Sequence, residues 1–259
     1  YSWVSYQTAY LKAHYPAEYM AAVMSRNLDN ITEITKLMDE CRAMSIPTLG
    51  PDVNESWQKF SANKKGEVRF GLAAIKGMGD AAAQAIIDER QKNGPYKSIY
   101  DFAERVNLSA VNRKAFESLA LSGAFDSFPI KREQYFGVNT KGDTFLDTLV
   151  RYGQLYQNEI AQARNSLFGG DNAVEIATPP IIKGEQWSDI ERLNRERDLV
   201  GIYLSAHPLD EYRIVLDNLC NTKCAELNDV ASLNDREDII IGGIVTGTQS
   251  KYTKSGKPC

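Results

Sequence analysis

Two glycines, Gly77 and Gly79, separate an apolar segment from a helix-forming one, and they constrain this chain more than any other feature. Residues 71–75 are almost wholly apolar, and Asp80 opens a run of small and apolar residues that favours a helix with Asp80 at its N-cap. Because glycine adopts backbone conformations that other residues avoid, the pattern predicts a tight turn between two helices.

A turn of this kind suits a phosphate group. It exposes backbone N–H groups where the second helix presents the positive end of its dipole. Lys76 adds a mobile positive charge, and Met78 is expected to anchor the turn in the core. The alternative is a tight connection between two packed helices that binds nothing. A dinucleotide-binding fold fits poorly, because the preceding segment has a helical pattern and no second strand–helix unit follows.

Most of the remaining chain has the apolar spacing of helices. Pro16 divides residues 7–26 into two helices, each of which we expect to turn an apolar stripe to the core. Asn112 starts a helix that Gly123 closes in a left-handed conformation. The other expected helices cover residues 31–44, 80–91, a short stretch from Ser98 or Asp101, 131–165 with an interruption near 140–143, and 188–204.

Three further segments have other patterns. Residues 57–60 and 68–72 predict a short extended pair around a polar turn. Residues 169–185 are rich in glycine and proline and predict a linker. Residues 238–246 are β-branched and predict a strand.

The net charge of −4 averages regions of opposite sign. Residues 60–130 carry ten basic and eight acidic side chains, whereas residues 186–238 carry six and twelve. Affinity for nucleic-acid phosphates comes from lysine and arginine, so the first region is the candidate for DNA. We expect the acidic helix over residues 189–198 to present a solvated face.

The length of 259 residues, 43% of them hydrophobic, suits about two domains. No apolar run is long enough to cross a bilayer and no signal peptide is evident, so we expect a cytoplasmic protein without membrane contact. The two ends suggest a fragment. Cys220 and Cys224 have no second pair of ligands nearby, so we expect no metal site, and no group of side chains indicates catalysis.

Four blocks of sequence carry a more specific signal: Tyr6–Pro16, Gly71–Gly79, Asn112–Lys114 with Ser122–Asp126, and Gly201–Leu209. In this order they resemble the alpha subunits of bacterial DNA polymerase III, the C-family replicative polymerases. The second block, with Ala83 and Ile86, looks like a helix-hairpin-helix motif. The resemblance covers nearly the whole chain.

The resemblance implies a mainly α fold with a helical end of the fingers, tandem helix-hairpin-helix elements and a small β segment that begins an OB-fold. Residues 1–60 would end the fingers, and 61–130 would bind duplex DNA. Residues 131–185 would hold the clamp-binding segment and a linker, 186–238 a connecting helical region, and 239–259 the truncated start of the OB-fold.

The resemblance also implies the contacts. Lys76, Gly77, Met78 and Gly79 would hold duplex phosphates. The second hairpin element departs from the pattern, because residues 106–109 contain no glycine pair, which leaves Arg113 and Lys114 as its best phosphate candidates. Double-stranded primer-template DNA, the sliding clamp and other replicase subunits would be the partners, with single-stranded template a further partner of the OB-fold.

For the clamp, family members carry a Gln-x-x-(Leu or Met)-Phe peptide. This chain has Arg164 where the glutamine belongs and keeps the apolar anchors Leu167 and Phe168. The alternative is a helix end that packs Leu167 and Phe168 into its own domain. A rival function follows from the same residues, namely a protein-interaction scaffold whose main role is docking to the clamp.

Catalysis belongs elsewhere on this interpretation. In the family, the acidic ligands for Mg²⁺ lie upstream of the first residue of this chain, and two-metal phosphoryl transfer needs such ligands. We therefore expect the parent protein to be a DNA-directed DNA polymerase that uses Mg²⁺. The present 259 residues should bind and position DNA but be inactive alone, with no cofactor of their own.

Overall fold

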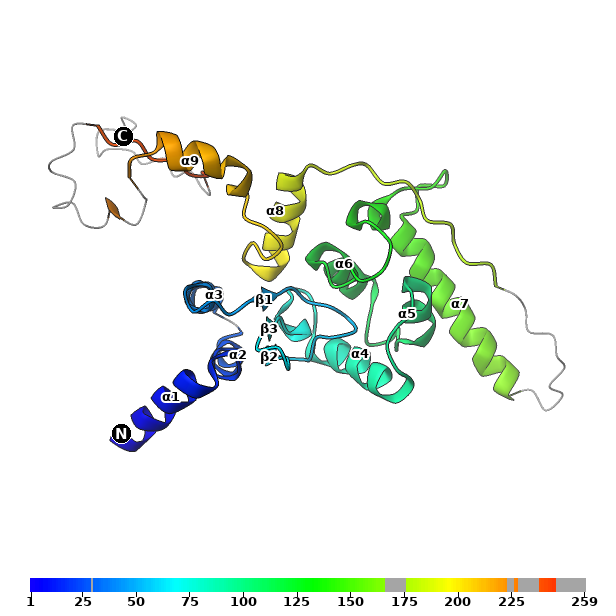
Figure 1. The fold of residues 1–259 in the computed structure, drawn as a ribbon. Coiled ribbons are helices and arrows are strands. Elements are labelled where there is room, and N and C mark those ends of the chain that lie inside the picture. Colours follow the sequence, from blue (N-terminus) through cyan, green and yellow to red (C-terminus); the bar gives the residue numbers. More distant parts are fainter. Residues whose placement is uncertain (29, 166–175, 223–225, 228–237, 246–259) are drawn as a thin grey trace, which may run out of the picture. The chain divides into compact units, whose positions relative to one another are not determined.

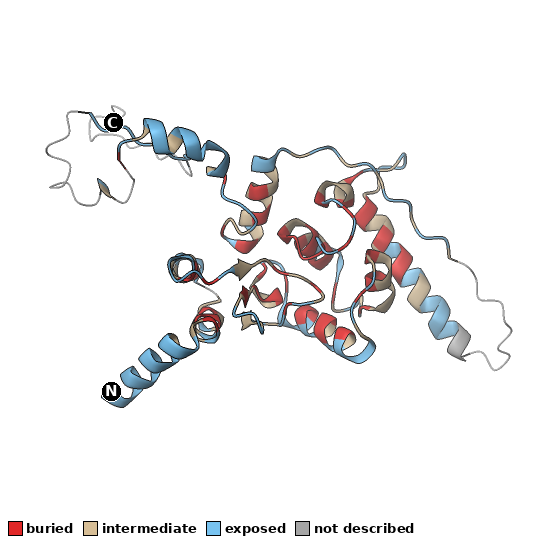
Figure 2. Cartoon of the chain, in the orientation of Figure 1, coloured by how far each residue is buried: buried red, intermediate tan, exposed pale blue. Residues whose placement is uncertain are grey.

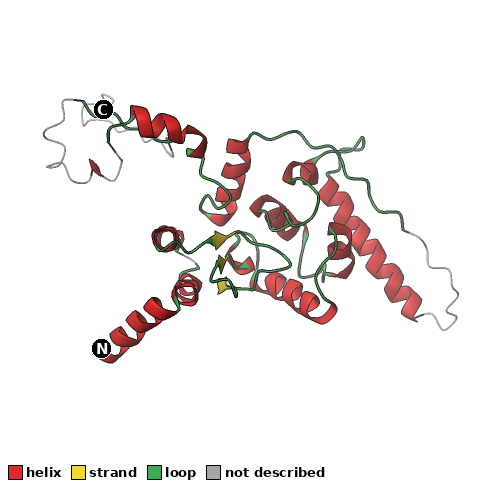
Figure 3. Cartoon of the chain, in the orientation of Figure 1, coloured by secondary structure: helices red, strands yellow, loops and turns green. Residues whose placement is uncertain are grey.

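The computed structural model describes residues 1–28, 30–165, 176–222, 226–227 and 238–245 (Figure 1). The described part is mainly helical and carries one small three-stranded sheet (Figure 3), which confirms the expected fold class. The chain divides into two compact units, residues 1–205 and 206–259. The finer domain boundaries expected at residues 60, 130, 185 and 238 stay predictions.

The elements of the first unit are α1 (Ser2–His14), α2 (Pro16–Arg26), α3 (Ile31–Ala43), β1 (Thr48–Leu49), β2 (Ser61–Ala62), β3 (Val68–Arg69), the 3₁₀ turn η1 (Leu72–Ala74), α4 (Asp80–Asn93), α5 (Ile99–Arg105), α6 (Arg113–Ser122), the 3₁₀ turn η2 (Arg132–Phe136), α7 (Phe145–Asn165) and α8 (Asp189–Val200). The second unit holds the 3₁₀ turn η3 (Asp210–Tyr212) and α9 (Arg213–Leu219).

Local capping chemistry fixes several of these helix ends as predicted. Pro16 stands at the start of α2, where its missing N–H costs nothing. The Ser98 hydroxyl accepts from the amide of Asp101, and the Asn112 side chain accepts from the amide of Ala115 at 3.0 Å. Gly123 ends α6 in the left-handed conformation, with φ +85°.

The sheet has β3 at its centre, parallel to β1 and antiparallel to β2. Ser61 pairs with Arg69 across the antiparallel ladder, which confirms the extended pair expected around the polar turn. The parallel neighbour, in which Thr48 pairs with Val68, was not expected. A strand of two residues leaves no alternating pattern in the sequence from which it could be predicted.

An aromatic cluster forms the centre of the first unit, where α5, α6 and α7 meet (Figure 2). Phe102 packs edge-on against Phe116 and Phe125, with ring centroids 5.3 and 5.1 Å apart. Tyr135 and Phe145 extend the cluster toward α7, and each is no more than 1% exposed. Such rings bury large apolar areas, so this cluster positions the helices around it.

Helix α1 does not bury the stripe that was expected of it, because none of its residues is buried. Trp3, Tyr6 and Tyr10 are 69%, 63% and 46% exposed, and Figure 2 shows the helix as solvent-exposed along its length. An apolar stripe is buried only where a second layer covers it, and the described part of the chain places none over these rings. Helices α2 and α3 do bury apolar faces.

Residues 238–245 form no strand in the described part of the second unit, which corrects the expectation of a strand over 238–246. The Ile240 carbonyl accepts from the amide of Asn221 at 3.1 Å, and the Asn221 side chain accepts from the amide of Ile240 at 2.9 Å. Bonds at one residue do not make a ladder, and a strand requires a partner backbone along its length. The OB-fold stays a prediction, since residues 246–259 lie outside the described part.

Candidate nucleic-acid interface

The predicted turn lies between η1 and α4. Ile75 is extended and Gly77 adopts φ +86°, a conformation that favours glycine. Gly79, and not Asp80 as predicted, is the N-cap of α4, so the helix begins one residue earlier than expected, at Asp80. The expected helix over residues 71–76 is wrong, because only Leu72–Ala74 form a 3₁₀ turn.

The cause is a neighbouring stretch of chain. The amides of Leu72 and Ala73 donate to the carbonyls of Trp57 and Gln58 at 2.9 and 3.0 Å. Ile75 then turns into the core, where it is 1% exposed. Because residues 72 and 73 are bonded to residues 57 and 58 and Ile75 is buried, only one helical turn fits between them. Packing therefore overrides the local helical pattern.

The turn leaves several backbone donors unused. Within the described part of the chain, the N–H groups of Gly77, Gly79, Asp80 and Ala81 have no hydrogen-bond acceptor. They precede or open α4, where the helix dipole favours an anion. The turn therefore has the donors of a phosphate site.

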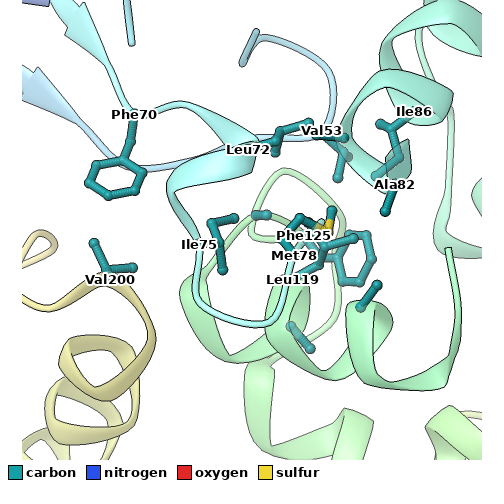
Figure 4. Packing of buried hydrophobic residues seen from close by; sticks show 14 of the residues in the cluster. Val53, Phe70, Leu72, Ile75, Met78, Ala82, Ile86, Leu119, Phe125 and Val200 are labelled. Carbon is teal, nitrogen blue, oxygen red and sulfur yellow. The ribbon is translucent and has the colours of Figure 1, made fainter. Parts of the chain in front are cut away.

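Met78 anchors this turn instead of contributing a donor to it. Its side chain is 6% exposed and belongs to the same core cluster as Leu119 and Phe125 (Figure 4). Its amide already donates to the Ile75 carbonyl at 3.0 Å. Of the four residues expected to hold phosphate, Met78 and Lys76 have amides that are already hydrogen-bonded, and of these two only Lys76 has a charged side chain to offer.

Two helices hold the hairpin from behind. The amide of Lys76 donates to the Leu199 carbonyl of α8 at 2.9 Å, and the Ser118 hydroxyl of α6 donates to the Lys76 carbonyl at 3.1 Å. A Cβ at Gly77 would lie 2.9 Å from the Ser118 hydroxyl. The hairpin thus packs on α6 and α8, and a side chain at Gly77 would push the hairpin away from Ser118 of α6.

Lys114 belongs to the first hairpin in space, although it follows the second turn in sequence. A Cβ at Gly77 would lie 3.5 Å from Lys114 Cε, so the end of this side chain lies over the hairpin. Lys76 and Lys114 are both exposed, and neither has a carboxylate partner among the described residues. The Lys114 side chain therefore lies beside Gly77 and its free amide, in the same turn as Lys76.

Arg113 differs from its neighbour. Its guanidinium donates to Asp147 at 2.9 Å and also pairs with Glu117. Burial raises the pKa of Asp147, but hydrogen bonds from Thr144 and Arg113 outweigh it and hold that pKa below its ordinary value. The pairing keeps Arg113 on α7 and away from a ligand.

The second turn, residues 106–112, accepts hydrogen bonds from several of its own amides. The Asn107 side chain accepts from the amide of Ser109 at 3.0 Å, and the Asn107 carbonyl accepts from the amides of Ala110 and Val111. The side chain of Gln157, on α7, donates to the Val106 carbonyl at 2.8 Å. The second turn is therefore braced through Asn107 and Gln157, whereas the amides of Asn112, Arg113 and Lys114 at the start of α6 have no acceptor in the described part of the chain.

Sequence analysis missed the buried ion pair that fixes α8. Glu196 is 1% exposed and accepts from Arg132 at 2.7 Å, although the acidic helix was expected to be a solvated face. Its carboxylate also accepts from the amides of Leu204 and Ser205 and from the Ser205 hydroxyl. Because the first unit ends at Ser205, this carboxylate ties the last residues of the unit to η2.

The pKa of Glu196 reflects this setting. Burial raises it, but the Ser205 hydroxyl and Arg132 stabilise the charged form and hold the pKa below its ordinary value of 4.5. A signal for this role was present in the Gly201–Leu209 block, whose Leu204 and Ser205 amides donate to the carboxylate. Spacing alone, however, does not distinguish Glu196 from the exposed acids on the same helix.

Other predicted features fall outside this interface. Leu167 and Phe168 lie outside the described residues, as does the side chain of Arg164, so the clamp-binding prediction has no structural test. In the described ranges no three His, Cys, Asp or Glu side chains are grouped as metal ligands would be. No described helix combines the length and apolar character needed to span a membrane.

Comparison with known proteins defines the class first. A family described as "Helix-hairpin-helix motif" matches residues 45–135, a range that contains both turns and α6. The chain is also 34% identical over 257 residues to DNA polymerase III subunit alpha of Vibrio cholerae. It is 36% identical over 260 residues to the subunit of Neisseria meningitidis serogroup B, and 35% identical over 257 residues to that of Thermus aquaticus.

Each of these alignments covers 99% of the chain, and the chain spans about a fifth of each relative's length, 20% to 21%. The chain therefore belongs to the DNA polymerase III alpha-subunit family, in the region that carries its helix-hairpin-helix motif.

Proposed function

We propose that this chain binds the sugar-phosphate backbone of duplex DNA as part of a replicative DNA polymerase. The observation that carries the proposal is the group of free amides around Gly77 and Gly79, with Lys76 in the same turn and the Lys114 side chain beside Gly77. Amides at a helix N-terminus and lysines complement phosphate oxygens and do not read base sequence. The site would grip DNA of any sequence.

The proposed contact set departs from the sequence prediction in two places. Arg113 is withdrawn because its guanidinium is engaged by Asp147 and Glu117. Met78 is kept only as an anchor, because its amide and side chain are occupied. Lys76, Gly77, Gly79 and Lys114 remain.

The double substitution Lys76→Glu/Lys114→Glu tests this function. Each phosphate contact contributes roughly 0.9 to the slope of log affinity against log salt, so losing two should flatten the slope by about 2 and weaken binding at low salt. Lys92→Glu/Lys97→Glu is the matched control because it makes the same charge change at two exposed lysines, one in the last turn of α4 and one in the loop after it. If both variants lose duplex affinity equally, binding is diffuse and the hairpin site is refuted.

The parent protein would be a DNA-directed DNA polymerase, as the name of its relatives states. Two-metal phosphoryl transfer needs a cluster of acidic ligands for Mg²⁺, and the described residues do not fit that requirement. On this proposal the chain binds DNA, and the rest of the parent protein carries out phosphoryl transfer. Primer extension by the purified 259 residues would contradict this assignment.

A second function, docking to the sliding clamp, is supported by the Leu167-Phe168 pair in the sequence. Two adjacent apolar side chains suit a pocket, and buried anchors supply most of the binding energy of such peptides. Leu167→Ala/Phe168→Ala should abolish capture of the clamp while duplex affinity is unchanged. Undiminished capture would refute this docking site, and the duplex measurement keeps the two functions separate.

A further inference from the structure

A hollow of about 610 Å³ lies on the first unit beside the sheet, and the proposed function makes no use of it. Trp57 and the turn between β2 and β3 form its walls, together with Arg69 from β3. The turn contributes Asn63, Lys64 and Lys65. An aromatic ring and two lysines around one hollow are a combination that suits a nucleic-acid strand.

Trp57 is a fixed platform with an accessible ring. It is 47% exposed, while the Arg90 guanidinium lies over the ring at 5.5 Å from its centroid. Arg90 is itself held by the Val53 carbonyl at 2.8 Å and is only 9% exposed. The backbone of Trp57 is tied to η1 through Leu72. The ring is therefore positioned before any ligand arrives.

The turn holds both lysines outward without tying up their charge. The Asn63 side chain accepts from the amides of Lys65 and Glu67 at 2.9 and 3.0 Å, which closes the turn. Lys64 and Lys65 are exposed, and neither has an ion-pair partner in the part of the chain that the structure describes.

The acids in the wall of the hollow are already engaged. Glu67 accepts from the Asn63 amide group at 2.7 Å, and Glu55 pairs with Arg69. With Arg69 paired to Glu55, Lys64 and Lys65 outnumber the remaining carboxylate, Glu67, and the lining carries a net charge of +1.

We propose that this hollow binds single-stranded DNA, with a base stacked on Trp57 and adjacent phosphates held by Lys64 and Lys65. Bases in a duplex are stacked on one another and cannot offer a face to a fixed ring, so the tryptophan selects an unpaired strand. The inference goes beyond duplex binding. Because Trp57 and Gln58 hold η1, which leads into the Gly77 hairpin, the single-strand and duplex sites lie at the two ends of residues 57–79.

Fluorescence of Trp57 provides a local test. In a Trp3→Phe/Trp187→Phe background Trp57 is the sole tryptophan, and phenylalanine preserves the ring contact of residue 187 with Phe136. A thymidine decamer should quench this fluorescence saturably and bind about tenfold more tightly than an abasic decamer of the same length. DNA bound elsewhere on the chain would not quench Trp57, so absence of quenching overturns the proposal.

Substitutions separate this site from the hairpin. Lys64→Glu/Lys65→Glu changes an exposed tip that contributes nothing to the core, and it should weaken thymidine-decamer binding while blunt-duplex affinity holds. Lys76→Glu/Lys114→Glu should do the reverse. Equal binding of the thymidine and abasic decamers, or no effect of the tip substitutions, overturns the single-strand site and leaves the duplex proposal standing.

Discussion

The two turns of the helix-hairpin-helix region have the same place before a helix but differ in how their backbone amides are used. At the first turn Gly77 and Gly79 carry no side chain, and the amides there have no acceptor in the described part of the chain. At the second turn Asn107 and Asn112 accept from the local amides, and Gln157 donates to the backbone from α7. Asn107 thus engages amides inside the second turn, whereas Gly77 and Gly79 have no side chain that could engage those of the first.

The basic residues follow the same division. Lys114 is the second residue of α6, the helix after the second turn, yet its side chain lies beside Gly77 of the first. Arg113, its neighbour, is bound to α7 through Asp147. The difference teaches that a tandem repeat need not hold two phosphate sites, because the helix of the second repeat, α6, can support the first turn and supply it with a lysine. Four predictions test this comparison.

The largest effect is expected from Glu196→Ala, which removes one of the two carboxylates that pair with the buried Arg132 and leaves only Asp126. Removing one partner of a buried pair costs about 3–5 kcal/mol in the free energy of unfolding. Because the Leu199 carbonyl of α8 holds the Lys76 amide, hydrogen exchange at Lys76 should accelerate more than exchange at Val111 in the second turn. Uniform acceleration at both amides would show that α8 does not brace the first hairpin in particular.

Gly77→Ala should come next. A non-glycine residue at φ +86° costs about 1–2 kcal/mol, and contact with the Ser118 hydroxyl adds to it and displaces the hairpin. Gly142→Ala is the matched control, since its φ is +88° and no atom lies within 4 Å of the added methyl. Denaturant unfolding should show a loss for both, whereas duplex affinity should fall for Gly77→Ala alone. A similar fall for the control would mean that strain, and not hairpin geometry, governs binding.

A pH titration of stability tests the Glu196 carboxylate, which holds α8 behind the first turn. The pKa of Glu196 lies below its ordinary 4.5, so its charged form stabilises the fold above pH 4.5 and that contribution is lost as the pH falls through the depressed value. The groups facing it are Arg132, Ser205 and, across the guanidinium, Asp126. The stability gap between the wild type and Glu196→Gln should narrow in acid. A gap that is constant from pH 7 to pH 3 contradicts the assignment.

The smallest effect is expected from Arg113→Ala. Partly exposed ion pairs contribute about 0–1 kcal/mol, so unfolding should change little. Duplex affinity should stay within about twofold of the wild type, whereas Lys114→Ala should lower it severalfold and flatten the salt slope by roughly 1. Equal losses for the two variants would restore a phosphate site to the second turn and end the distinction between the repeats.

Much of this molecule was predictable from local signals. Pro16, Ser98, Asn112 and Gly123 mark helix ends by chemistry that acts over three or four residues, and the structure has those ends where the sequence placed them. Two glycines with a following helix likewise predicted the turn. The errors share one cause. The helix over 71–76 and the solvated face of α8 both failed where distant residues, Trp57 and Arg132, supplied hydrogen bonds that spacing cannot encode.

The candidate site divides in the same way. The sequence by itself determined which residues turn the chain and which carry charge, because backbone freedom and side-chain ionisation are properties of single residues. Only the tertiary structure decided which of them act together. In the folded chain Lys114 lies beside Gly77, Arg113 pairs with Asp147, and Glu196 is buried against Arg132. Residues dozens of positions apart come together in this way because their elements pack around a shared core.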